Sequence, residues 1–326
     1  MCSITSTIPS HHFRSTSLQI QNTSPAVSSL LENKNRFDTN PSMRLNEHYE
    51  KQLPIDNHKM DFLNMVKSCD LLLLRGAPGS GKSTRAPAYV LSEGGNDVRI
   101  LCTEPRKVAA IMLAQQVAKE GGVKLTHDFT SCIGYDVRGE KCFPAAKGSL
   151  LYSTTGWAVN TIMLHNFTHI FVDEIHERLL DMDMLLLLLK KIIKLRQMKI
   201  ILMSADLNIS FLTDYFKEFN VKSIDVGGTP FPVDHYFLDT AGAPDLNRDG
   251  ITDAEAIQIF LDWFKLEGNL LICLDNVKSI NALSSGSHQR FTFVPWHGSL
   301  TQAQQVDIVR CKKNAATQTM KRPRLY

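Results

Sequence analysis

The fold of this chain is decided by Leu71-Leu-Leu-Leu-Arg-Gly-Ala-Pro-Gly-Ser-Gly-Lys-Ser-Thr84, a run of leucines followed by a glycine-rich loop. The leucines predict a strand that is buried on both faces, as in a parallel sheet. The loop fits the phosphate-binding pattern G-x-x-x-x-G-K-[ST] between Gly76 and Ser83. A flexible turn would also contain glycine and proline. Here, however, the pattern lies between a predicted strand and a predicted helix, where a phosphate loop belongs.

The residue types in this loop suit a bound phosphate. Glycines allow successive backbone N–H groups to curl around the anion, and the following helix directs the positive end of its dipole at it. Lys82 is expected to reach the β- and γ-phosphates of a bound nucleotide, and the Ser83 hydroxyl to hold Mg²⁺. Pro87 falls inside the following helix, where a proline can bend it. The expected nucleotide-binding residues are Gly76, Ala77, Pro78, Gly79, Ser80, Gly81, Lys82, Ser83 and Thr84.

The composition excludes several classes of protein. The chain has 326 residues, 43% hydrophobic and 21% charged, which is ordinary for a globular protein and long enough for two domains. The most apolar run, residues 185–189, is far shorter than the roughly 18 to 20 residues of a membrane span, so no membrane partner is expected. Seven cysteines without a C-x-x-C pair indicate a reducing compartment and neither a disulfide framework nor a zinc site. A net charge of +3 is too weak to indicate a nucleic-acid partner by itself.

The first 50 residues are predicted to be disordered. They are rich in Ser, Thr, Asn and His and carry no acidic residue before Glu32, so they cannot bury enough apolar surface to fold. A segment of this kind could engage protein partners. An organelle transit peptide is also rich in Ser and poor in acids, but Arg14 is the only Lys or Arg among the first 30 residues here. The sequence therefore favours a cytoplasmic or nuclear protein.

Strand and helix patterns alternate over residues 53–203, which predicts an α/β fold with a parallel sheet covered by helices on both faces. In such sheets ligands bind beyond the carboxyl ends of the strands. Apolar residues at helical spacing, including Met60, predict a helix before the first strand, with its apolar face buried in the core. Thr103 is expected to cap a later helix that ends at Gly121–Gly122. The predicted strands are 71–74, 98–103, 149–153, 168–172 and 199–203. One further helix is predicted to follow Thr154–Gly156 and to end near Leu164, and another is predicted at 179–195.

Two adjacent carboxylates, Asp173 and Glu174, follow the predicted strand 168–172 directly. They should lie at the same sheet edge as Lys82, because the carboxyl ends of parallel strands meet there. In nucleotide hydrolysis one acidic residue orients Mg²⁺, usually through water, and its neighbour activates the attacking water. We therefore assign Asp173 to the metal and Glu174 to the catalytic base; the alternative is that the pair simply opens an exposed loop. His176 alone would indicate only a structural residue at a helix start.

Five segments taken together resemble the DEAH-box RNA helicases of helicase superfamily 2. They are Gly76–Thr84, Thr103–Ala110, Thr154–Gly156, Asp173–His176 and Ser204–Asp206, in that order. The resemblance covers roughly residues 53–310. It implies a RecA-like ATPase domain that uses ATP and Mg²⁺, and a surface that binds single-stranded RNA with little regard to its sequence.

The resemblance also implies roles for individual residues. Lys82 and Glu174 match catalytic residues of the nucleotide site, and Ser83 and Asp173 match its metal-binding residues. His176 matches the residue that senses the nucleotide and communicates with a second domain. The implied RNA-contacting residues are Arg106, Lys107, Thr154, Thr155 and Gly156, and the implied coupling residues are Ser204, Ala205 and Asp206.

A second RecA-like domain is expected to begin near Gly227–Pro232, because Pro230–Val233 and Pro295–His297 resemble segments that bracket its start in the family. Within it, a polar loop is expected at 239–250, a helix at 254–264, and strands at 269–274 and 291–294. The predicted organisation is a disordered segment at 1–50, a RecA-like domain at 51–228, a partial second RecA-like domain at 229–310 and a disordered tail at 311–326.

The chain departs from the family pattern in three places. Asp206 stands where the family usually has Thr, and Thr155 where it usually has Asp. Nothing after Arg310 resembles the later motifs, which include arginine fingers worth about 10³ to 10⁵ in rate. The leading hypothesis is an ATP-dependent RNA helicase that hydrolyses ATP slowly as this chain alone. The alternatives are a non-catalytic ATP- or RNA-binding protein and a different P-loop enzyme, such as a small-molecule kinase.

Overall fold

The computed structural model describes residues 49, 51–206, 208–228, 252–263, 271–286, 292–301, 303–305, 307–308 and 324–325. The predicted disordered segment 1–50, apart from Tyr49, and the expected loop 239–250 lie outside the described residues. So do Pro230–Val233 and most of the predicted tail 311–326. The domain boundaries therefore remain predictions.

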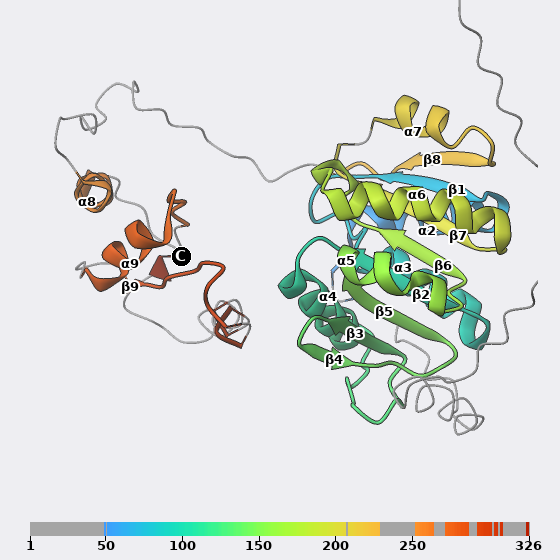
Figure 1. Ribbon diagram of the computed structural model, residues 1–326, viewed down its shortest axis with the longest axis horizontal. Helices are drawn as coiled ribbons and strands as arrows, with labels where there is room; N and C mark the ends of the chain where they lie inside the picture. The colour runs from blue at the N-terminus through green and yellow to red at the C-terminus, as the bar shows by residue number, and fades with distance from the viewer. Residues whose placement is uncertain are drawn as a thin grey trace, which may run out of the picture. The chain divides into compact units, whose positions relative to one another are not determined.

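Helices and strands alternate through residues 51–228, as predicted (Figure 1). In chain order the elements are η2 Pro54–His58, α2 Lys59–Ser68, β1 Leu71–Arg75, α3 Arg85–Gly94, η3 Gly95–Asp97, β2 Arg99–Glu104, α4 Lys107–Glu120, β3 Ile133–Val137, β4 Glu140–Cys142, β5 Ser149–Thr154, α5 Thr155–Thr161, η4 Ile162–Leu164, β6 His169–Val172, η5 Ile175–Glu177, α6 Leu180–Leu195, β7 Lys199–Ser204, α7 Ile209–Tyr215 and β8 Val221–Asp225.

The strands of this region form one sheet in the order β4-β3-β5-β2-β6-β7-β1-β8. Every neighbouring pair is parallel except β3 and β4, which form an antiparallel hairpin at one edge. β1 lies between β7 and β8, with Leu71 opposite Ile200 on one side and Val221 on the other. The predicted α/β fold is confirmed, and its sheet is parallel except at that edge.

Successive residues of β1 pack on opposite faces of the sheet. Leu72 and Leu74 belong to a core that also contains residues of α2, α3 and α4, whereas Leu71 and Leu73 belong to a second core with residues of α5, α6 and α7. All four leucines are fully buried. Burial of one leucine side chain contributes about 1.5–3 kcal/mol. The leucine run therefore fixes the sheet between two layers of helices, which confirms the prediction that both faces are covered.

Helix α4 begins later than the sequence predicts. β2 continues through Glu104, which pairs with Thr154 of β5, so Thr103 is a strand residue and not a helix cap. Arg106, with an extended backbone, takes the N-cap position instead. Pairing with β5 keeps this segment extended for one residue beyond the predicted strand end. At its other end, α4 stops at Gly121 as predicted.

Several features of this region were missed or predicted wrongly. β3 and β4 are joined by the two-residue turn Arg138–Gly139, and β8 lacks an apolar run because it is an edge strand that is mostly exposed or half-buried. α7 has only seven residues and is capped by the Asn208 side chain, which accepts a backbone N–H at 3.0 Å. Met60 is 66% exposed rather than buried, because it lies about 200° around α2 from the buried residue two positions later.

Residues 252–308 contain a further group of elements. α8 Asp253–Trp263 confirms the expected helix, and β9 Thr292–Phe293 confirms part of the strand expected at 291–294. The strand expected at 269–274 is wrong for residues 271–274, where Ile272 instead packs in a loop against Leu261 of α8. α9 Val277–Ser285 was not predicted, and β10 Arg324–Leu325 runs parallel to β9. None of the described helices is both long and apolar enough to cross a membrane.

Candidate active site

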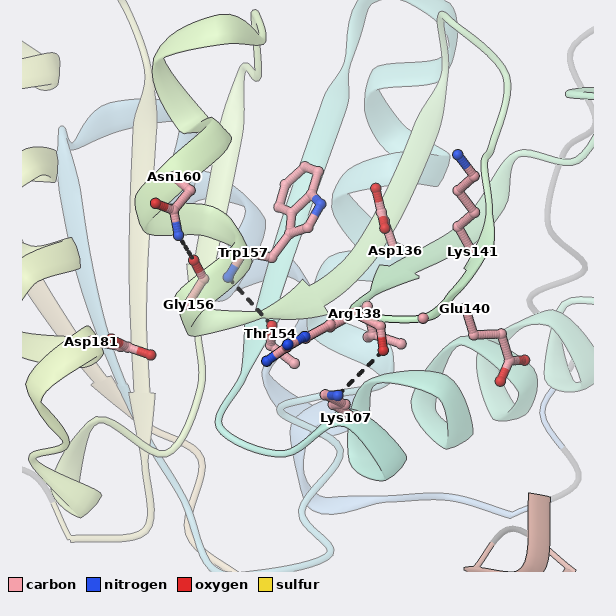
Figure 2. A pocket seen from close by; sticks show the side chains of 12 residues that line it. Lys107, Asp136, Arg138, Glu140, Lys141, Thr154, Gly156, Trp157, Asn160 and Asp181 are labelled. Carbon is pink, nitrogen blue, oxygen red and sulfur yellow. Dashed lines mark hydrogen bonds between the residues drawn. The ribbon is translucent and has the colours of Figure 1, made fainter. Parts of the chain in front are cut away.

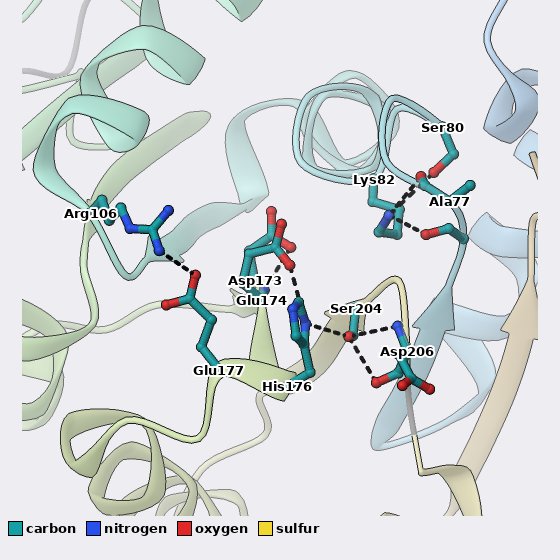
Figure 3. Close-up of polar contacts among 11 residues, drawn as sticks. Ala77, Ser80, Lys82, Arg106, Asp173, Glu174, His176, Glu177, Ser204 and Asp206 are labelled. Carbon is teal, nitrogen blue, oxygen red and sulfur yellow. Dashed lines mark hydrogen bonds and ion pairs between the residues drawn. The ribbon is translucent and has the colours of Figure 1, made fainter. Parts of the chain in front are cut away.

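The five motif segments meet at one edge of the sheet. β5, β2, β6, β7 and β1 are consecutive neighbours and all parallel, so the residues that follow them share the carboxyl-terminal edge. Figure 3 shows the loop after β1, the acidic turn after β6 and the turn after β7 lying next to one another. The sequence prediction that these motifs share one edge is confirmed.

At two positions of the phosphate loop a Cβ would lie too close to a neighbouring side chain. A Cβ at Gly76 would lie 2.5 Å from Val226 Cγ2, and one at Gly81, where φ is 96°, would lie 2.7 Å from Ile55 Cγ2. The Gly76 N–H also donates to the Ser204 carbonyl at 3.2 Å. The loop is therefore tied directly to the last residue of β7.

A buried tyrosine completes the first turn of α3. Pro87 is the third residue of this helix, where proline is tolerated, but it has no N–H to donate to the carbonyl of Ser83 four residues earlier. The Tyr152 hydroxyl, from the middle of β5, donates to that carbonyl at 2.8 Å. Burial raises the pKa of Tyr152 well above its usual value, so the hydroxyl remains a donor. The backbone of Ser83 is thus anchored to β5.

Lys82 is buried within the loop, and its ammonium lies among loop oxygens. Nζ donates to the carbonyls of Gly76, at 2.5 Å, and Ala77, at 3.0 Å, and lies 3.4 Å from the Ser80 hydroxyl (Figure 3). Burial lowers the pKa of Lys82, and the two carboxylates after β6 oppose that shift. A phosphate oxygen would offer this ammonium a charged acceptor in place of neutral ones, which is the stronger kind of hydrogen bond.

The acidic turn after β6 combines a buried and a half-exposed carboxylate. Asp173 is buried, and its Oδ1 accepts the Glu174 N–H at 2.9 Å. Glu174 has a φ of 51°, a left-handed conformation that is strained for a residue with a Cβ. Strained residues of this kind cluster at functional sites. Burial, and then the charge of Asp173, raise the pKa of Glu174. A raised pKa makes a carboxylate a stronger base, which suits the role predicted for Glu174.

A second buried carboxyl group lies beside Asp173, and the sequence analysis did not single it out. Glu104 ends β2, the strand next to β6. Burial raises the pKa of Glu104 well above its usual value, and the charge and hydrogen bond of Asp173 raise it further. A raised pKa favours the protonated form of Glu104, which can then donate a hydrogen bond. Its position was an available signal, because Glu104 follows a buried strand just as Asp173 does.

His176 joins the acidic turn to the turn after β7. Its Nδ1 lies 2.8 Å from Ser204 Oγ and 3.3 Å from Glu174 Oε2. An ionised carboxylate only accepts hydrogen bonds, so this network assigns the proton to Nδ1. Ser204 Oγ then donates to the Asp206 carbonyl at 3.1 Å and accepts the Asp206 N–H at 3.1 Å. The unusual Asp206 thus contacts Ser204 through its backbone.

The residues predicted to contact RNA lie at the ends of β2 and β5. Arg106 and Lys107 are exposed at the start of α4. Arg106 forms an ion pair with Glu177 at 3.1 Å, and Lys107 Nζ donates to the Arg138 carbonyl at 3.2 Å. Thr155 is buried, and its hydroxyl donates inward to the backbone at the end of β2. The Thr155 side chain therefore cannot contact an external ligand, and only the backbone of this residue could do so.

A hollow of about 790 Å³ opens beside these residues, between the β3–β4 hairpin and the starts of α4 and α5 (Figure 2). Its lining includes Arg138, Lys141 and Trp157, which the sequence analysis missed. The turn Arg138–Gly139 was a usable signal, because a glycine within a short turn indicates a hairpin. Three basic and three acidic side chains line the hollow, so hydrogen bonding and stacking, rather than net charge, would select a ligand there.

In the sheet, a single strand, β7, separates the phosphate loop after β1 from the carboxylates after β6. With the enclosed lysine of the loop, this arrangement defines a RecA-like P-loop domain, a class whose common ligand is a nucleoside triphosphate.

Comparisons with known proteins identify the family. The chain is 33% identical over 220 residues to the mouse ATP-dependent DNA/RNA helicase DHX36, a match that covers 64% of this chain and 22% of the relative. It is 31% identical over 303 residues to the mouse ATP-dependent RNA helicase TDRD9, with 78% and 22% covered. It is 37% identical over 203 residues to the human putative ATP-dependent RNA helicase DHX57, with 59% and 14% covered.

No family model matches the chain. The chain spans less than a quarter of the length of these curated relatives. By its similarity to them it belongs to the DExH/DEAH-box helicases, which confirms the resemblance seen in its motifs.

Proposed function

We propose that the chain is an ATP-dependent RNA helicase of the DEAH-box type, which binds and hydrolyses ATP with Mg²⁺ and binds single-stranded RNA. One observation carries this proposal: the enclosed ammonium of Lys82, the buried Asp173 and the strained Glu174 lie at one sheet edge and are linked through His176 to Ser204. These are the groups that phosphoryl transfer to water needs, namely a phosphate clamp, a metal ligand and a base.

The residues present suit Mg²⁺, because the Ser83 hydroxyl and the Asp173 carboxylate are hard oxygen donors and this ion is usually held by few protein ligands together with phosphate oxygens. When bound, Mg²⁺ would neutralise charge that develops on the phosphates. Lys82 would leave its carbonyl acceptors for the phosphates. Glu174 would take the proton of the attacking water at its carboxylate. His176 contacts both that carboxylate and Ser204, so a change at the Glu174 carboxylate would alter the hydrogen bond between His176 and Ser204.

RNA would lie across the ends of β2 and β5. Arg106 and Lys107 would contact phosphates, and the backbone at the N-terminus of α5, Thr154–Gly156, would offer N–H donors. The hollow beside them adds Trp157, on whose ring a base can stack, as is common in the recognition of single strands. Contacts of this kind depend on the backbone and on stacking, so binding should tolerate many sequences.

Binding of a fluorescent ATP analogue tests the nucleotide site. Lys82→Ala should weaken the affinity at least tenfold, because it removes the charge that contacts the phosphates. Lys124→Ala removes an exposed lysine beyond the far end of α4 and should leave the affinity unchanged. Equal affinities of the wild type and Lys82→Ala would contradict the assignment of the loop.

Salt titration of RNA binding tests the RNA surface. The affinity should fall as the salt concentration rises, because phosphate contacts release counterions. Arg106→Glu should weaken binding strongly, whereas Lys119→Glu, at the opposite end of the same helix, should not. A response that does not depend on salt, or equal effects of the two variants, would count against the proposed surface.

Hydrolysis distinguishes the helicase from one of the alternatives left open by the sequence, the non-catalytic binding protein. A helicase active site predicts slow release of phosphate by this chain, with little stimulation by RNA, and Glu174→Gln should abolish that release. Binding of ATP and RNA without hydrolysis that depends on Glu174 would favour the alternative, a non-catalytic ATP- and RNA-binding protein.

A further inference from the structure

One ion pair connects the proposed RNA surface to the acidic turn. Arg106 Nη2 lies 3.1 Å from Glu177 Oε1 (Figure 3). The Arg106 side chain is 77% exposed, whereas that of Glu177 is 24% exposed. The guanidinium thus reaches out from the start of α4, and the carboxylate is the more fixed partner. This inference rests on the proposed function, since it takes Arg106 as an RNA contact.

Glu177 belongs to the same short turn as the proposed catalytic base. It is the last residue of η5, and its N–H donates to the Glu174 carbonyl at 2.9 Å. The two residues that flank η5, Glu174 and Arg178, both have left-handed backbones, with φ of 51° and 48°. A three-residue turn closed by a hydrogen bond and bounded by two strained residues has few alternative conformations. A displacement of Glu177 should therefore be transmitted through the turn to Glu174.

RNA and Glu177 compete for the same cation. A phosphate oxygen and a carboxylate oxygen are both anionic acceptors for a guanidinium, and phosphate can engage it in a bidentate manner. The arginine of this pair is largely exposed. An exposed ion pair favours the paired over the unpaired state by only up to about fivefold. A phosphate positioned by its other contacts can displace the carboxylate.

We propose that Glu177 couples RNA binding to the nucleotide site. Without RNA, its carboxylate holds Arg106 and keeps η5 in the observed conformation. When RNA binds, a phosphate replaces the Glu177 carboxylate at Arg106. The turn η5 is then free to shift, and its shift moves Glu174 and His176. Glu177 is a positioning residue, because it acts through Arg106 and Glu174 and not on the reacting atoms.

The test measures RNA affinity in four proteins: the wild type, Glu177→Gln, Arg106→Ala and the double variant. The probe is a short, fluorescently labelled oligouridine, measured by anisotropy without nucleotide. Glu177→Gln keeps the shape of the side chain but loses its charge, so it should bind the probe about two- to fivefold more tightly than the wild type. In the Arg106→Ala background the same substitution should have no effect. An equal gain in both backgrounds would indicate a general charge effect and overturn the proposal, as would no gain in either.

A second measurement tests the coupling itself. The affinity of a non-hydrolysable ATP analogue is measured with and without saturating oligouridine, since coupling between two sites must appear in both affinities. The wild type should show a ratio different from one, and Glu177→Gln a ratio closer to one. An unchanged ratio in Glu177→Gln, or a ratio of one in the wild type, would overturn the proposal. If the wild type does not bind oligouridine, or if Arg106→Ala binds it equally well, the proposed RNA surface itself is wrong, which is a separate result.

Discussion

Replacing Tyr152 by phenylalanine should destabilise the domain by removing one oxygen atom. The side chain is 0% exposed, and its hydroxyl donates to the Ser83 carbonyl at 2.8 Å. Pro87 cannot supply a replacement N–H, so the carbonyl loses its donor. An unpaired buried acceptor costs about 1–3 kcal/mol. Because Ser83 is itself only half-buried, water can partly compensate, and we expect the free energy of unfolding to fall by about 1–2 kcal/mol.

Urea unfolding measures this loss, and Tyr135→Phe is the matched control. The Tyr135 hydroxyl donates to Glu140 Oε1 at 2.6 Å, but Glu140 is exposed and water can take over that bond. The control should therefore change stability by about 0.5 kcal/mol or less. Tyr152→Phe should also weaken binding of an ATP analogue with Mg²⁺, because the backbone of Ser83 is less firmly held. The reasoning is refuted if the two variants are equally stable and Tyr152→Phe binds the analogue like the wild type.

Three further predictions concern stability. Arg85→Ala should lower the free energy of unfolding by about 3–5 kcal/mol, because it leaves Asp56 without its buried cationic partner; a loss below about 1 kcal/mol in urea unfolding would contradict this. Burial lowers the pKa of His169 to about 4, below its unfolded value of about 6.5, so stability should be complete above pH 6.5 and decline toward pH 4. The decline should be about 2 kcal/mol at pH 5, and urea unfolding of His169→Gln at pH 7 and pH 5 should lack it. Gly81→Ala should destabilise the domain more than Gly79→Ala in thermal unfolding, because both positions have positive φ but only the first adds a 2.7 Å contact with a neighbouring side chain.

The parts of the fold that were predictable depend on patterns local to the chain. The leucine run indicates its strand, and the spacing of Gly76 to Ser83 indicates the loop, because each pattern lies within a few consecutive residues. The helix start at Thr103 was predicted wrongly because pairing with β5, which is distant in sequence, extends β2. The hydrogen bond from Tyr152 to Ser83 joins residues 69 positions apart, so no local pattern in the sequence predicts it. The assignments of individual residues to ATP, Mg²⁺ and RNA remain predictions.

The left-handed backbone of Glu174 places stability and the proposed hydrolysis in conflict at one residue. In this conformation a residue with a Cβ is roughly 1–2 kcal/mol worse than glycine. Glu174→Gly would relax the chain and at the same time delete the carboxylate that the proposed hydrolysis needs. A random library selected only for heat resistance should therefore accumulate Glu174→Gly, and a library selected for nucleotide hydrolysis should lose it. Which substitution survives at position 174 would show which of the two pressures acted.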